Sequence, residues 1–270
     1  VDDIYGWNFL GGKDGRNVKE DSYEAARVYH QLKGKFGTMV PDESSVKPEE
    51  KSELELYRKA RAKVVDEVNP AEIGFIKKLL PGFLKGDSVI KKDLDKTEYS
   101  CTDLENYTTT NADARKTKGF LIQLCKGNGT NDLTNKQIIE ELESSLRKAD
   151  AAENEPKAYR KDIVQDNEND INDRNYGNND VMASTPLHGT HCAGIIAAAR
   201  NNGKGGDGVA DNVRIMMLRA VPDGDEHDKD IALAIRYAVD NGAQIISMSF
   251  GKDFSPQKQW VDDAVRYAEQ

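Results

Sequence analysis

Two histidines three positions apart, His188 and His191, are the side chains of this sequence best suited to chemistry. They open a run of small and apolar residues that continues to Ala199, which predicts a buried helix with the histidines at its start. A histidine at a helix N-terminus lies at the positive end of the helix dipole, which disfavours the imidazolium form. Because a neutral ring can accept a proton, we expect His188 to act as a general base.

The two histidines also allow two other interpretations. Their spacing places both rings on one helix face, where they could bind a metal ion, but the glutamate of a His-Glu-x-x-His metalloprotease motif is absent. They could equally be ordinary core histidines of a non-catalytic α/β domain. The surrounding motifs must decide between these readings.

The segment His188-Gly-Thr-His191-Cys-Ala-Gly194 resembles the histidine motif of subtilisin-like serine proteases, the subtilases of peptidase family S8. The resemblance continues, in the family's order, through four further segments: Asn201-Asn202-Gly203, Gly208-Val209-Ala210, Arg214 to Val221 and Ile245 to Gly251. It implies a serine-type endopeptidase of a bacterial type, with a long helical insertion between the aspartate and histidine motifs. His188 would then be the general base of a Ser-His-Asp triad, and His191 would be structural.

The resemblance also implies a substrate groove. Ser249, Phe250 and Gly251 are expected to leave a strand end and to pair their backbone with an extended peptide or protein substrate. Ser249 is not the expected nucleophile, because it stands in a Ser-Phe-Gly context and not in the family's Gly-Thr-Ser motif.

The triad is incomplete in this sequence. Neither an Asp-Ser/Thr-Gly motif before His188 nor a Gly-Thr-Ser motif after it occurs in the 270 residues. The expectation is a chain truncated at both ends, whose full-length protein hydrolyses peptides while this chain alone is inactive. The alternative is a catalytically dead, subtilase-like peptide-binding module.

Alternating elements in the C-terminal half predict an α/β fold. Strands at Val213–Val221 and Gln244–Phe250 alternate with helices that begin at Asp228 or Asp230 and at Pro256, which predicts part of a parallel sheet with helices on both faces. Residues 163–270 are therefore expected to form a partial protease core. Residues 1–18 are expected to be an N-terminal segment of that core.

Residues 19–162 have helical periodicity almost throughout and are expected to form a mostly α-helical insertion. The helices expected there are 20–36, 48–68, one beginning at Asn69-Pro70 with a break or kink at Pro81-Gly82, one beginning at Thr110 or Asn111, and 136–153. Thr134 and Gln137 suggest a capping box for the last of these.

Composition limits the partners and cofactors. A net charge of −9 argues against nucleic acid and anionic membranes, and no apolar run is long enough to span a bilayer. The resemblance implies a secreted, periplasmic or cell-surface protein that needs no cofactor for catalysis. Structural calcium is possible in the Asn- and Asp-rich segment 162–180, although turn formation alone would explain its composition.

The cysteines leave one pairing open. Cys101 and Cys125 could form a disulfide in an oxidising compartment, but their separation in sequence does not fix their geometry. Cys192, inside the histidine motif, is expected to be a buried, unreactive thiol.

Overall fold

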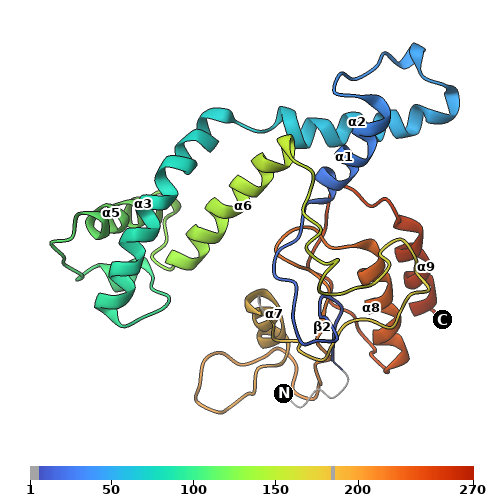
Figure 1. Ribbon diagram of the computed structural model, residues 1–270. Coiled ribbons are helices and arrows are strands. Elements are labelled where there is room, and N and C mark those ends of the chain that lie inside the picture. Colours follow the sequence, from blue (N-terminus) through green and yellow to red (C-terminus); the bar gives the residue numbers. More distant parts are fainter. Residues whose placement is uncertain (1–5, 184–185) are drawn as a thin grey trace. The chain divides into compact units, whose positions relative to one another are not determined.

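The computed structural model describes residues 6–183 and 186–270 (Figure 1). The chain folds into two compact units: the described residues of Val1–Tyr57 and Glu155–Gln270 form unit 1, and Arg58–Asn154 form unit 2. Parts of two expected features, Val1–Tyr5 of the N-terminal segment and Ser184–Thr185 before the histidine motif, lie outside the described residues. In the described ranges, no helix is both long and apolar enough to cross a membrane.

Unit 1 contains two short strands and several helices. Its elements are β1 Trp7–Asn8, α1 Glu24–Phe36, the 3-10 turns η1 Glu43–Ser45 and η2 Pro48–Glu50, the start of α2 Lys51–Arg61, α7 Leu187–Ala197, β2 Leu218–Arg219, α8 Asp228–Asp240 and α9 Lys258–Ala268. Strands β1 and β2 run parallel, with Trp7 opposite Leu218 and Asn8 opposite Arg219. Helices α8 and α9 lie side by side (Figure 1).

The core of unit 1 gathers segments that are far apart in the sequence. Phe9, Leu10 and Val18 come from the N-terminal segment, and the inward face of α8 supplies Ile231 and Ile235. Tyr176 contributes from the Asn- and Asp-rich segment, which is irregular as expected. This core joins the N-terminal segment to residues 155–270, so that β1 and α8 share one hydrophobic interior.

The predicted parallel sheet is much reduced in the described residues. The strand expected at Val213–Val221 is a strand only at Leu218–Arg219, and Gln244–Phe250 forms no strand. Ile245 is 89% exposed instead of buried. Both predictions rested on apolar runs, which indicate a tendency to be buried but do not supply the neighbouring backbone that a strand needs.

Unit 2 is helical. After the C-terminal half of α2, it contains the short π-helical segment η3 Ala62–Asp66 and the helices α3 Pro70–Leu94, α4 Cys101–Leu104, α5 Ala112–Asn128 and α6 Asn135–Glu153. Helix α3 packs against both α5 and α6 (Figure 1). Two start signals are confirmed: the Asn111 side chain accepts hydrogen bonds from the first turn of α5, and Thr134 with Gln137 forms a capping box for α6.

The break expected at Pro81-Gly82 is wrong, because α3 continues through Pro81 to Leu94. Leu80 and Phe83 on either side of this proline are buried. Packing of the helix therefore outweighs the hydrogen bond that proline removes.

Cys101 and Cys125 form a disulfide, with their Cα atoms 6.6 Å apart. It links α4 to the end of α5 inside a core that also contains Leu104, Leu121 and Ile138. The pairing that the sequence left open is thus made within unit 2.

Candidate functional site

Helix α7 carries the histidine motif on an exposed surface. His188 and His191 are both exposed, and α7 has no buried residue among those described. The prediction of a buried helix is therefore wrong, and Ile195 is 68% exposed. The physical reason is that the apolar strands expected to cover this helix do not assemble into a sheet in the described residues.

Cys192 is the neighbour of His188 on the same helix face. Its Sγ lies 4.0 Å from Nδ1 and 3.9 Å from Nε2 of the His188 ring, one helical turn away. The thiol is half-buried, not fully buried as expected. The ring of His188 is thus accessible to a reacting group.

The loop after α7 folds back on the end of that helix. The backbone N–H groups of Gly208, Val209 and Ala210 donate to the carbonyl oxygens of Ala198, Ile195 and Ile196 at 2.9–3.0 Å. These bonds satisfy carbonyls that a helix C-terminus leaves without partners. A side chain at position 208 would lie 2.8 Å from the Ala197 carbonyl carbon, so only glycine allows this close approach.

The expected groove residues Ser249, Phe250 and Gly251 are exposed and irregular. Among the described residues, no hydrogen bond joins them to His188. The structure therefore does not assemble the predicted site residues into one constellation. The next residue is firmly held: Lys252 Nζ lies 2.8 Å from Glu24 Oε2 and 2.9 Å from Asp228 Oδ1.

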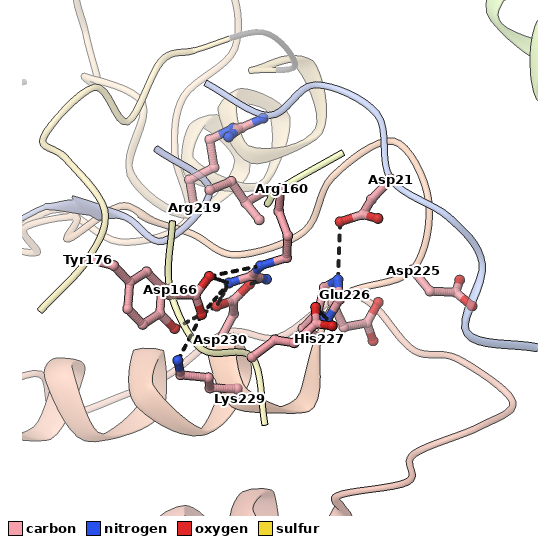
Figure 2. A network of polar contacts seen from close by, with 12 residues as sticks. Asp21, Arg160, Asp166, Tyr176, Arg219, Asp225, Glu226, His227, Lys229 and Asp230 are labelled. Atoms are coloured by element: carbon pink, nitrogen blue, oxygen red, sulfur yellow. Dashed lines mark hydrogen bonds and ion pairs between the residues drawn. The ribbon is translucent and has the colours of Figure 1, made fainter. Parts of the chain in front are cut away.

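A buried ionic network at the start of α8 was not predicted from the sequence (Figure 2). Lys229 Nζ lies 2.8 Å from Asp166 Oδ2, and Arg160 Nη2 lies 3.0 Å from the same oxygen. Arg160 Nη1 also lies 2.6 Å from Asp230 Oδ2, and the Tyr176 hydroxyl donates to Asp230 Oδ1 at 2.6 Å. These contacts attach segment 160–176 to α8.

Burial and neighbouring charges shift the pKa of Asp166 in this network in opposite directions. Burial raises the pKa of the Asp166 carboxyl, but the charge of Arg160 and the hydrogen bond from Lys229 more than offset it, so the pKa lies below its ordinary value. Burial together with the charge of Asp230 raises the pKa of the Tyr176 hydroxyl well above its usual range. The Asp166 carboxyl therefore stays ionised and the Tyr176 phenol stays neutral, which is the state that their observed bonds require.

A second group of charges surrounds the loop before α8 (Figure 2). His227 Nε2 lies 3.1 Å from Asp21 Oδ2, and its Nδ1 lies 3.8 Å from Glu168 Oε2. The Asp225 carboxylate accepts a hydrogen bond from the backbone N–H of Glu24 at 2.8 Å and so caps α1. A histidine beside a buried carboxylate can serve in catalysis, but no hydroxyl or thiol is hydrogen-bonded to this ring in the part of the chain that the structure describes.

Both groups of charges fix segment 222–230, which leaves β2 and opens α8. A sequence signal existed: Asp228-Lys229-Asp230 places a cation between acids at a helix start. The sequence analysis used Asp228 and Asp230 only as a helix start, because the partners Arg160 and Asp166 are distant in the chain. The described residues contain no group of three or more His, Cys, Asp or Glu side chains arranged to hold a metal ion.

Comparison with known proteins finds a family match for the C-terminal part of the chain. Residues 142–270 match the model of the subtilase family. This part of the chain is similar to the subtilases. It contains His188, the expected groove residues and the buried ionic network around Asp166, whereas Asp21 and α1 lie outside the match.

Several curated subtilases and related serine proteases are similar to parts of the chain. "Thermophilic serine proteinase" of Bacillus sp. (strain AK1) is 46% identical over 82 residues, which cover 30% of this chain and 20% of the relative. "Thermitase" of Thermoactinomyces vulgaris is 38% identical over 112 residues, 39% of each chain. "Halolysin-like extracellular serine protease Nep" of Natrialba magadii is 45% identical over 65 residues, 24% of this chain and 12% of the relative.

The chain thus spans between 12% and 39% of the length of these three relatives. No solved structure matches it. The subtilase assignment therefore rests on the sequence of residues 142–270 and on these relatives.

Proposed function

We propose that this chain contributes the histidine-bearing part of a serine endopeptidase that hydrolyses peptide bonds through a Ser-His-Asp triad. The observation that carries the proposal is the motif at His188–Gly194, within a segment that matches the model of the subtilase family. The relatives named above are called serine proteinases or proteases, which supports the same activity.

His188 is the general base in this proposal. Its ring would take the proton of a serine hydroxyl as that oxygen attacks the scissile carbonyl, and would then give the proton to the leaving amine. The exposed position of the ring on α7 is compatible with a reacting group reaching it. His191, on the same helix, is proposed to be structural.

The aspartate and serine of the triad are proposed to lie outside residues 1–270, because their motifs do not occur in this sequence. Residues 1–270 alone are then inactive. Without the aspartate the imidazole is not oriented, and without the serine no acyl-enzyme can form.

Residues 249–251 are proposed to bind the substrate main chain. They are exposed and make no backbone hydrogen bond among the described residues, so their N–H and C=O groups can pair with an extended peptide. Lys252, fixed by Glu24 and Asp228, would hold this backbone in place. The substrate is accordingly an extended peptide or protein.

The helical region 19–162 is proposed to be an insertion between parts of one protease core. The separate compactness of Arg58–Asn154, with its own disulfide, supports this organisation. The same disulfide supports a location outside the cytoplasm, since such bonds persist in oxidising compartments. Two similar proteins carry "extracellular" and "cell wall-associated" in their names, although another is named an intracellular protease.

Peptide hydrolysis by the complete product of the coding sequence tests the proposal. With a fluorogenic peptide library, we expect His188→Ala to lower kcat/KM by at least about 10³-fold. The matched control His30→Gln, which changes a histidine on α1, should leave kcat/KM unchanged. Full activity in the His188→Ala protein would overturn the proposal, and peptide binding without hydrolysis by the unaltered protein would favour a non-catalytic binding module.

A further inference from the structure

A pocket of about 540 Å³ lies on unit 1, in the range of small-molecule binding sites. It is formed by β1 and the residues that follow it, by segment 174–177 and by the second half of α8. The residues that line it and carry the argument are Trp7, Phe9, Lys13, Arg174, Arg236 and Tyr237.

Aromatic side chains line the pocket, and three of them are held in place. The rings of Trp7 and Tyr237 stack with centroids 6.4 Å apart, and Phe9 meets Tyr237 edge to face at 6.2 Å. Trp7 Nε1 donates to the Tyr176 carbonyl at 3.0 Å. The positions of the Trp7 and Tyr237 rings are therefore fixed by contacts within the protein.

Gly177 makes this arrangement possible. Its backbone has a φ of 92°, and a Cβ there would lie 2.5 Å from Trp7 Nε1. A larger residue would be strained and would displace the indole ring. The close approach of segment 174–177 to Trp7 is thus specific to glycine at this position.

The pocket is also lined by three cationic side chains, although the whole chain carries a net charge of −9. Lys13, Arg174 and Arg236 contribute cations, and in the described ranges none of them has a carboxylate partner. Arg174 Nε donates only to the Ile171 carbonyl at 3.3 Å, and the Arg236 guanidinium lies over the Tyr267 ring at 4.9 Å.

The lining of the pocket also contains one acid, Asp240. Asp240 accepts a hydrogen bond from the Tyr267 hydroxyl at 2.6 Å. The lining therefore combines aromatic rings and three cationic side chains with a single carboxylate. Most other arginines of this acidic protein form ion pairs with carboxylates. The cations that line the pocket are therefore suited to binding an anionic ligand.

We propose that this pocket binds a carboxylate carried on an aromatic or other flat apolar group. The apolar group would stack on Trp7 and Tyr237, and the carboxylate would accept hydrogen bonds from Arg174 and Arg236, with Lys13 adding charge. Two sources share this chemistry: a free aromatic acid and a peptide that ends in an aromatic residue. This site is separate from the proposed catalysis at His188 and does not depend on it.

Calorimetric titration of the 270-residue chain with 3-phenylpropionate tests the proposal, with the neutral 3-phenylpropionamide as matched ligand. We expect the acid to bind about tenfold more tightly than the amide, since a charge-assisted hydrogen bond is worth more than a neutral one. Arg236→Gln and Arg174→Gln should each weaken binding of the acid by about tenfold. Arg266→Gln, on the exposed part of α9, should leave binding unchanged.

The fold of each variant is checked by urea unfolding followed through tryptophan fluorescence. Lys13→Gln offers a third, exposed position, for which we expect a smaller loss of affinity. A peptide ending in Phe with a free carboxylate distinguishes the sources: tighter binding than 3-phenylpropionate indicates a chain end, and equal or weaker binding indicates a free acid. Equal affinity for acid and amide, unchanged binding in folded Arg236→Gln, or no heat of binding at millimolar acid would each overturn the proposal.

Discussion

The ammonium of Lys229 lies 2.8 Å from Oδ2 of Asp166, and neither side chain reaches solvent, with 0% and 1% exposed. This pair joins the Asn- and Asp-rich segment to the first turn of α8. Because Arg160 pairs with the same carboxylate and with Asp230, each cation and each acid of the network has an opposite charge beside it. The segment that leaves β2 therefore enters α8 from a fixed position.

Replacing Lys229 by Met should destabilise unit 1 by about 3 kcal/mol, because it removes one of the two cations that compensate the buried Asp166 carboxylate and leaves only Arg160 beside it. The matched control is Lys258→Met, which removes a cation from an exposed pair with Asp262 and should cost less than about 0.5 kcal/mol. Both tryptophans, Trp7 and Trp260, lie in unit 1, so urea unfolding followed by tryptophan fluorescence reports this unit. Equal unfolding free energies for the two variants would show that the Lys229 pair is not stabilising.

Unit 1 should lose stability in acid. The pKa values of Asp21, Glu24 and Asp166 are lowered below their ordinary values of 3.8, 4.5 and 3.8: burial raises each of them, and the neighbouring cations or hydrogen bonds outweigh it. As the pH falls below the ordinary pKa of these carboxyls, the unfolded state takes up protons before the folded state does. The stabilisation of unit 1 by the ionised carboxylates is therefore complete above about pH 5 and is lost below it.

Urea midpoints by tryptophan fluorescence at pH 7, 5, 4 and 3 measure this loss. We expect a shallow dependence between pH 7 and 5 and a steep fall below pH 4.5, with a smaller fall in Asp166→Asn. A stability that continues to rise down to pH 3 would contradict the assignment of these carboxylates as stabilising ion pairs.

Glu226→Gln should stabilise unit 1 at neutral pH. Glu226 is 5% exposed, and burial raises the pKa of its carboxyl. The folded state then binds a proton more tightly than the unfolded state, so ionisation opposes folding above the folded pKa. The expected gain is on the order of 1 kcal/mol at pH 7 and should shrink as the pH falls toward 4.5.

The exposed Glu269→Gln is the control and should change the unfolding free energy by less than about 0.5 kcal/mol. A Glu226→Gln protein that is less stable than the unaltered chain at pH 7 would contradict the prediction. It would mean that neighbouring groups stabilise the ionised Glu226 carboxylate by more than its burial costs.

Removing the Cys101–Cys125 disulfide should destabilise unit 2. The bond closes a loop of 24 residues, for which chain entropy predicts a loss of about 3 kcal/mol in the Cys101→Ala/Cys125→Ala double variant. Cys192→Ala is the matched control in unit 1. Since unit 2 contains no tryptophan, hydrogen exchange of the amides of α3, α5 and α6 is the measurement, and unchanged protection there would refute the expectation.

Local signals in the sequence predicted the helices well. Asn111 and Thr134 mark helix starts because a cap is a contact between residues two or three apart. The strands at 213–221 and 244–250 were overpredicted, because pairing depends on a distant neighbour that an apolar run does not specify. The break expected at Pro81 was wrong for a related reason. The packing of α3 against other helices keeps it continuous, and such contacts cannot be read from neighbouring residues in the sequence.

The same distinction applies to the site. His188 was identified as a candidate base from a contiguous motif. Its exposure on α7 could not be predicted, because the burial of a helix depends on which other elements pack against it. The ionic network could not be predicted either. Arg160 and Asp230 are 70 residues apart, and without the fold their charges resemble those of any solvated surface.

The most direct test of the account is covalent labelling by a fluorophosphonate probe, which reacts with an activated serine. The account predicts no labelling of residues 1–270, and labelling of the complete product of the coding sequence that is abolished by His188→Ala. Labelling of a serine within residues 1–270 would contradict it, as would labelling of the complete protein that does not depend on His188.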